Sequence, residues 1–287
     1  MVASATRSWL LLSIGAAGLA MLGSAVALAD QQVYDQLTKA FLSQALAQDL
    51  VNLVVVSPAI MVLAVLALRG SVRAYPLWLG TLLFTAYNYV IYTVAIPFGT
   101  LFLLWVAVLG MTLFALLGGA AVIDRAELLA HYRDVRAPRV AGWALIVIAL
   151  LFGALWLSED VPALLAGTPP ASLAEQGVIT NPVHVLDLAF FLPATLLVGT
   201  AWLRGSARAG TFAPAFLAFL LFTGLPIIVT PVVQAVRGDD AAWGVIVPIG
   251  IITVIVLGLL GWLISSMGPG TTTGGAHPDR RGHPSDP

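Results

Sequence analysis

The chain has 287 residues, of which 60% are hydrophobic and only 9% are charged, and its mean hydropathy is +0.98. Soluble domains carry about 25% charged residues, so this composition indicates a multi-pass membrane protein. The net charge of −1 gives no sign of nucleic-acid binding. The absence of cysteine excludes disulfides, thiol catalysis, iron–sulfur clusters and Cys-ligated zinc. The one lysine, Lys39, lies outside the apolar runs, which excludes a retinal Schiff base within a membrane helix.

Eight apolar segments are each long enough to cross a bilayer as a helix, which takes about 17–25 residues. Four of them, residues 9–29, 51–68, 75–96 and 101–122, belong to a first half, residues 1–122. The other four, residues 141–157, 183–203, 211–236 and 243–264, belong to a second half, residues 141–267. The sequence therefore predicts an all-α transmembrane helix bundle. Residues 9–29 are either a retained helix or a signal peptide, because Ala27-Leu28-Ala29 has the small residues of a cleavage site.

The connections carry their own patterns. Residues 30–49 are polar with apolar residues at helical spacing, which predicts either a helix on the outer membrane surface or a plain extension of the second span. A charged cytoplasmic loop, residues 123–140, joins the halves, and Glu159 with Asp160 opens the loop before the sixth span. Pro214, Pro226 and Pro231 predict kinks in the seventh span. The Gly/Thr/Pro/His-rich tail, residues 268–287, is expected to be disordered.

The basic residues predict the orientation of the spans. With the N-terminus inside, eleven of the thirteen lysines and arginines fall on the cytoplasmic side, and only Lys39 and Arg237 fall outside. An excess of basic residues in cytoplasmic segments is the strongest topology signal in membrane proteins. Both termini are therefore expected to be cytoplasmic, with the His184 end of the sixth span facing outward.

A repeated segment suggests that the two halves arose by duplication. Residues 68–74, Leu-Arg-Gly-Ser-Val-Arg-Ala, recur as Leu-Arg-Gly-Ser-Ala-Arg-Ala in residues 203–209. Pro58 and Pro193 each stand eleven residues before the first arginine of their copy. Phe84-Thr85 has a counterpart in Phe222-Thr223 after a three-residue insertion. The matched prolines favour a parallel 4+4 repeat over a common cytoplasmic turn that happens to occur twice.

Asp187 marks the candidate site, because an ionised group inside the bilayer costs roughly 3 kcal/mol on insertion scales and needs a partner or a function. His184 lies three residues earlier on the same helix face. In the repeat, Asp49 aligns with His184 and Asn52 aligns with Asp187. Asn88 and Tyr92 share a face of the third span near its outer end. These side chains are expected to meet in one outward-facing polar vestibule.

Four interpretations of these residues stay open. Asp187 and Asn88 can be hydrogen-bonded contacts between helices, which contribute about 0.6 kcal/mol each on average. They can also form a ligand, ion or proton site, because intramembrane carboxylates mark such pathways. A metal site would need ligands beyond His184 and Asp187, so no metal and no cofactor is predicted. Acid–base catalysis by these two residues is the fourth interpretation, and no known catalytic motif supports it.

Three segments carry a resemblance to other proteins: Asp49-Leu-Val-Asn52, Tyr87-Asn-Tyr89 and Asn181-Pro-Val-His-Val-Leu-Asp187. They resemble segments of a group of uncharacterised bacterial multi-spanning membrane proteins, and the similarity covers the membrane part but not the tail. The resemblance implies a bacterial cytoplasmic membrane. It implies no activity and no functional residues.

The sequence leaves three functions open. The best supported is a carrier or channel for a small solute or ion, with Asp187 as the coupling group. The alternatives are a membrane-embedded enzyme acting on a lipid-type substrate and a non-catalytic assembly or sensing subunit. The expected partners are the lipid bilayer and a small solute or ion, and the oligomeric state stays open.

Overall fold

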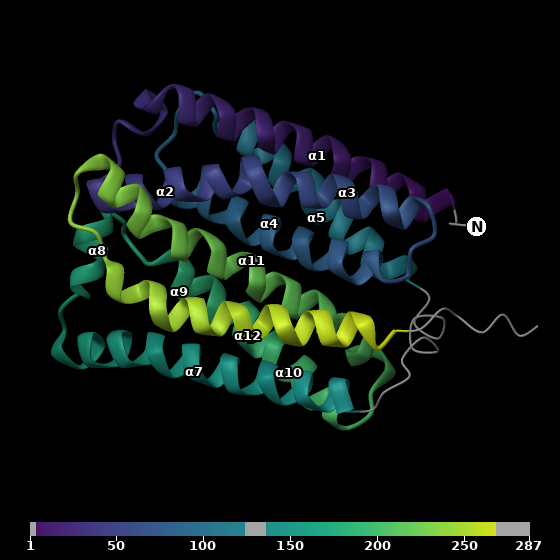
Figure 1. Cartoon of the computed structure of the whole chain (residues 1–287). Helices are drawn as coiled ribbons and strands as arrows, with labels where there is room; N and C mark the ends of the chain where they lie inside the picture. The colour runs from purple at the N-terminus through teal and green to yellow at the C-terminus, as the bar shows by residue number, and fades with distance from the viewer. Residues whose placement is uncertain (1–3, 124–135, 268–287) are drawn as a thin grey trace, which may run out of the picture.

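The computed structural model describes residues 4–123 and 136–267, and Figure 1 shows them as a bundle of long helices. Within these ranges, eight helices are long and apolar enough to cross a membrane. This confirms the expected all-α, multi-pass architecture. The eight are α1 (Ser4–Ala29), a continuous helix of α2 (Lys39–Val51), η2 (Asn52–Val56) and α3 (Ser57–Leu68), α4 (Ala74–Ala95), α5 (Phe102–Val122), α7 (Arg136–Ala166), a continuous helix of α9 (Pro182–Leu186), η3 (Asp187–Phe191) and α10 (Leu192–Leu203), α11 (Ala207–Arg237) and α12 (Ile246–Ser265). The expected disorder of residues 268–287, and most of the expected loop 123–140, lie outside the described residues.

The segment before the second span is part of that span. After a short 3-10 turn, η1 (Gln31–Tyr34), Thr38 caps α2 by accepting a hydrogen bond from the Phe41 amide at 3.3 Å. The helix then continues without a break to Leu68. Its first turns are buried at Phe41, Ala45 and other positions, so they do not lie on a membrane surface. The structure therefore agrees with the second interpretation of this segment, in which its residues from Lys39 onward extend the second span.

The fifth span is also longer than its apolar run. α7 continues past Leu157 to Ala166, so Glu159 and Asp160 lie inside the helix instead of opening a loop. The short helix α8 (Ala171–Gln176) follows, and Gly177 ends it in the left-handed conformation, with φ of 67°. Because α7 stays helical, its carboxylates project one turn beyond Trp156 on the same element.

The helices form two groups of four that meet along one line. In the first group α1 packs against α5 and α3, and α4 packs against α3 and α5. In the second group α7 packs against α10, and α11 packs against α10 and α12. Contacts between the groups run mainly from α11 to α4 and α2. The start of α1 and the end of α12 lie at one end of the bundle, and α8 lies at the other, here called the α8 end (Figure 1).

A π-helical segment interrupts one span in each group. The Ser57 amide donates to the Asn52 carbonyl, and the Leu192 amide donates to the Asp187 carbonyl, so each bond spans five residues. Pro58 and Pro193 come directly after these amides. A proline cannot donate to the carbonyl four residues earlier and its ring crowds that group, so one wider turn just before it relieves the clash. The two π segments begin at Asn52 and Asp187, the residues that the repeat aligns.

The close approach of α4 and α11 depends on Gly80. A β-carbon there would overlap the Ala215 carbonyl oxygen and lie 2.7 Å from the Ala218 β-carbon. Gly80→Ala is therefore expected to force the two groups apart and to lower the free energy of unfolding by about 1–3 kcal/mol. Thermal unfolding of the purified protein in detergent, followed by tryptophan fluorescence, measures the loss.

Gly258→Ala is the matched control, because nothing lies within 4 Å of a β-carbon at that position of α12. It makes the same change in helix propensity without touching the interface. Equal midpoints for the two variants would contradict the assigned role of Gly80.

Candidate functional site

A cavity of about 480 Å³ opens at the α8 end between the two helix groups. Its walls come from α2, α4, α7, α8, α9, α11 and α12. Exposed Glu175 and Ala242 line it at the α8 end, and buried Phe84 and Phe219 line it near the middle of the bundle. No residue from the first turns of α4 or α11 lines it. The cavity thus reaches from one end of the bundle to its middle.

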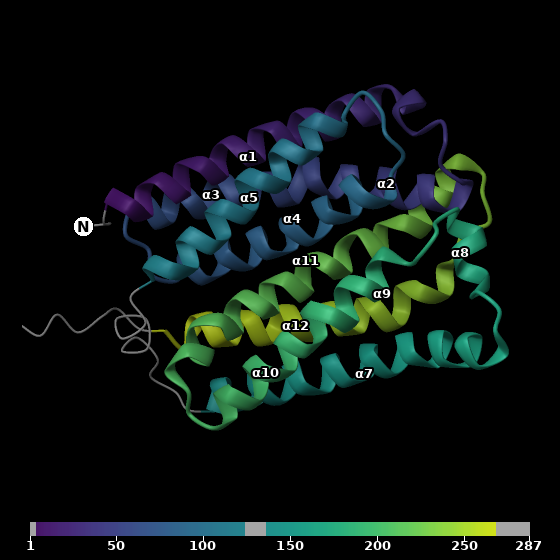
Figure 2. The ribbon, with the colours of Figure 1, turned by 180° about the vertical axis from the view of Figure 1, so that it is seen from behind.

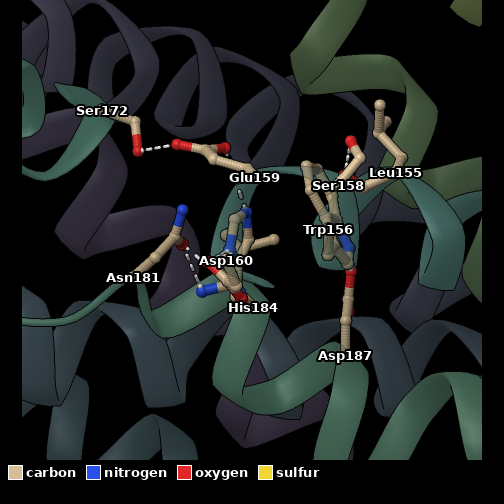
Figure 3. A network of polar contacts seen from close by, with 10 residues as sticks. Leu155, Trp156, Ser158, Glu159, Asp160, Ser172, Asn181, His184 and Asp187 are labelled. Carbon is tan, nitrogen blue, oxygen red and sulfur yellow. Dashed lines mark hydrogen bonds and ion pairs between the residues drawn. The ribbon is translucent and has the colours of Figure 1, made fainter. Parts of the chain in front are cut away.

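His184 stands in this wall at the start of α9. Asn181 caps the helix by accepting hydrogen bonds from the Val183 and His184 amides at 3.0 and 3.3 Å, and Pro182 occupies the first turn. The imidazole is only 5% exposed. Its Nδ1 lies 3.0 Å from Asp160 Oδ1, and its Nε2 lies 3.9 Å from Glu159 Oε2 (Figure 3). Two carboxylates from the end of α7 therefore flank one ring.

Trp156 links His184 to Asp187. Its ring lies against the imidazole, with centroids 4.4 Å apart, and its indole Nε1 donates to Asp187 Oδ2 at 2.8 Å (Figure 3). The Tyr87 hydroxyl on α4 interacts with the same carboxylate. Asp187 opens the π segment η3 and is only partly buried. Its partners are neutral donors, and no Lys or Arg of the described ranges pairs with it.

Aromatic rings and one amide complete the inner part of the cavity. Tyr87 packs edge-on against Phe191 and Phe219, with centroids 4.8 and 5.6 Å away, and those two phenyl rings stack on each other. Asn88 lines the cavity at 4% exposure, and its Nδ2 has no hydrogen-bond partner. A buried amide donor without a partner is uncommon and needs an explanation.

Asp49 lies in a separate, closed cluster inside the first helix group. It accepts hydrogen bonds from Ser24 Oγ at 2.8 Å, from the Tyr34 hydroxyl at 2.6 Å and from the Tyr92 hydroxyl at 3.0 Å. Trp105 covers both tyrosine rings. Burial, with the nearby Asp49 carboxylate, raises the pKa of Tyr34 well above its ordinary value, so this hydroxyl remains a donor. Three O–H donors thus satisfy this carboxylate, which forms no ion pair with a Lys or Arg of the described residues.

The structure divides the predicted site residues between these two places. Asp187, His184, Asn88 and Tyr92 line the cavity, whereas Asp49 and Asn52 do not. Tyr92 touches both places, because it lines the cavity and donates to Asp49. Asn52 is buried and accepts a hydrogen bond from Gln48 Nε2 at 3.0 Å, and its own Nδ2 is unpaired.

Three residues of α7 were missing from the predicted site: Trp156, Glu159 and Asp160. One signal could have found them: Glu159 and Asp160 follow Trp156 by three and four residues, so the three share a helix face if the helix continues. Among the described residues, no group of three or more His, Asp or Glu side chains is placed to hold a metal ion.

The two carboxylates should respond differently to replacement by asparagine. Asp49→Asn puts an NH₂ group among three hydroxyl donors in a closed space, so it should lower the free energy of unfolding by about 1–3 kcal/mol. Asp187→Asn keeps an acceptor for Trp156 beside an open cavity, and we expect a loss below about 1 kcal/mol. Thermal unfolding of both variants in one detergent makes the comparison. A larger loss for Asp187→Asn would show that this residue is the structural one.

A scan against protein-family models and searches of curated proteins and of solved structures find no match to this chain. The bacterial resemblance of the three sequence segments is not tested by them, and the function must be inferred from the geometry of the site.

Proposed function

We propose that this multi-pass membrane protein is a carrier for a small solute, with the cavity as its outward-facing binding site. The observation that carries the proposal is the extent of the cavity, which runs from the α8 end to the middle of the bundle and stops there. A carrier needs a site near the bilayer midplane that one side reaches at a time. A channel would need a path to the other end, and the lining residues provide none.

The distribution of arginines supports an orientation with the α8 end outside and both termini in the cytoplasm, and the sequence resemblance supports a bacterial cytoplasmic membrane. In this orientation His184 and Asp187 face the outer aqueous phase through the cavity. The packing of α1 supports its retention as a span, because Ser24 supplies a hydrogen bond to the buried Asp49 carboxylate.

A two-fold relation between the halves supports alternating access. The π segments η2 and η3 begin at aligned residues, and the helices after them end at Arg69 and Arg204 with the same backbone angles, φ −83° and ψ 5°. Phe84 and Phe222 are counterparts in the repeat, and their rings pack against each other with centroids 6.1 Å apart. Equivalent residues touch each other only near a two-fold axis. Such halves can rock about the α4–α11 line around a fixed site.

The prolines of α11 supply the flexible point. Pro226 and Pro231 lie inside the helix and line the cavity. Each lacks the amide hydrogen that would bond the carbonyl four residues earlier, at Phe222 and Ile227. The Thr230 hydroxyl adds a bond to the Pro226 carbonyl at 2.8 Å. Broken or kinked helices at the midplane are the usual moving parts of transporters.

An enzyme is the second candidate, because His184 is oriented by Asp160 as a general base would be. In that function, His184→Asn would abolish turnover without changing which side of the membrane reaches the cavity. The accessibility experiment below separates the two functions.

The absence of cysteine makes site-directed labelling direct. Thr230→Cys lines the cavity and should react with a membrane-impermeant thiol reagent added outside. Leu77, in the first turn of α4, packs against the core of the second group and does not line the cavity. Leu77→Cys should react only from the cytoplasm, when the cavity has switched. Thr112→Cys, fully buried, should react from neither side.

A carrier predicts that conditions which increase labelling at Leu77→Cys decrease it at Thr230→Cys. Constant labelling at Thr230→Cys with none at Leu77→Cys would contradict the carrier and leave a static outer pocket.

The orientation has its own test. Reporter fusions near Arg73, Arg136 and Arg208 should read cytoplasmic, and fusions near Gly177 or Asp240 should read external. An external signal at any of the arginine positions would overturn the proposed topology.

A further inference from the structure

We propose that the ligand of the cavity is a small organic cation, a quaternary or protonated amine, that also carries a hydroxyl or carbonyl oxygen. This inference rests on the proposed function, because it names the solute class of the same site. It follows from the charge of the cavity, from the rings around Asp187 and from the unpaired amide of Asn88.

The charged side chains that line the cavity are mainly acidic. Its ionisable lining residues are Glu159, Glu175, Asp187 and His184, and none of its lining residues is Lys or Arg. Asp160 and Glu159 already flank His184. Asp187 accepts hydrogen bonds from the neutral donors Trp156 and Tyr87, and it interacts electrostatically with His184. A buried carboxylate needs a positive partner. His184 is shared with two other carboxylates, and no Lys or Arg of the described residues pairs with Asp187, which leaves a place for a cationic ligand.

The walls around Asp187 fit an organic cation better than a metal ion. Trp156 and Tyr87 both contact the carboxylate, and Phe152 and Phe219 line the same space. Electron-rich ring faces attract ammonium groups, most strongly where water is excluded. A Ca²⁺ or Mg²⁺ ion would need six or more oxygen ligands, which these rings do not supply. The volume of about 480 Å³ also suits an organic molecule.

Asn88 adds the second requirement. It lines the same cavity from the position after Tyr87 on α4, and its buried Nδ2 has no hydrogen-bond partner. A tetramethylammonium ion offers no acceptor to this group. A cation that also carries an oxygen brings an acceptor into the same cavity.

The entrance favours a free solute over a lipid headgroup. Gln44, Gln48 and Gln234 line the cavity towards the α8 end, which gives a polar mouth. A cleft of about 290 Å³ adjoins it and shares Glu175 and Gln234. Asp239 forms an ion pair with Arg237 at 3.4 Å, which leaves Glu175 and Asp240 against Lys39 among the charged residues of this cleft. Negative charge around an aqueous mouth concentrates cations at it.

Choline and its neutral carbon isostere 3,3-dimethyl-1-butanol test the charge, and tetramethylammonium tests the oxygen. The full-length protein in detergent should show a concentration-dependent rise in unfolding temperature with choline. It should show a weaker rise with tetramethylammonium and none with the isostere. Equal responses to choline and its isostere, or no response to either cation, would overturn the proposal. This comparison uses only the wild-type chain and does not depend on the folding of any variant.

Two substitutions assign the contacts. Asp187→Asn should weaken choline binding at least about tenfold, whereas Asp35→Asn, which removes the same charge from an exposed position at the same end of the bundle, should leave the affinity unchanged. Asn88→Leu should remove the preference for choline over tetramethylammonium. Equal losses for Asp187→Asn and Asp35→Asn would contradict a direct contact.

The failure of this inference is distinguishable from failure of the carrier. Alternating cysteine accessibility without a choline response keeps the carrier and overturns the cation. A choline response with fixed accessibility keeps the cation and overturns the carrier. If phosphatidylcholine nanodiscs stabilise the protein but free choline does not, the site takes a lipid headgroup and the free solute is excluded.

Discussion

A carboxylate inside a membrane protein must find its hydrogen-bond donors and its counter-charge among the neighbouring helices, because lipid supplies neither. The chain meets this constraint in two ways. Asp49 receives three hydroxyl donors and is closed off by Trp105. Asp187 receives an indole and a tyrosine and remains beside open space. The first arrangement is complete by itself, and the second leaves a place for something else. That difference is why the site is centred on Asp187 and not on Asp49.

The two helix groups also differ in what occupies the space between their helices. In the first group, rings of Tyr34, Tyr92 and Trp105 occupy the space between α1, α4 and α5. In the second group, the corresponding space between α7, α11 and α12 is part of the cavity. If the halves arose by duplication, one copy has a sealed centre that gives rigidity, and the other has kept an open centre that can bind. A wide turn before a proline is present in both copies, which suggests that it belonged to their common design.

The architecture could be read from the sequence because lipid-facing positions must be apolar over the whole length of a span. The eight segments, the prolines and Asp187 all follow from that requirement. Glu159 and Asp160 could not be placed in the same way, since two acids after an apolar run look like the end of a helix. Only the continued packing of α7 carries them over the cavity. Tyr34 was also missed as a partner of Asp49, because the helical spacing of residues 30–49 does not predict the 3-10 turn that brings its hydroxyl to that carboxylate.

Three of the spanning helices are longer than a bilayer requires. The α2–η2–α3 helix has 30 residues, and α7 and α11 have 31 each, which gives about 45 Å against a hydrocarbon thickness of about 30 Å. In the orientation proposed above, the arginines after Leu68 and Leu203 and at the start of α7 lie at the cytoplasmic headgroups, so the surplus length extends at the α8 end. The cavity would then have a collar of helix that stands above the hydrocarbon. Bilayer thickness then sets how much of that collar is wetted, so the same protein would present a deeper entrance in a thin membrane than in a thick one.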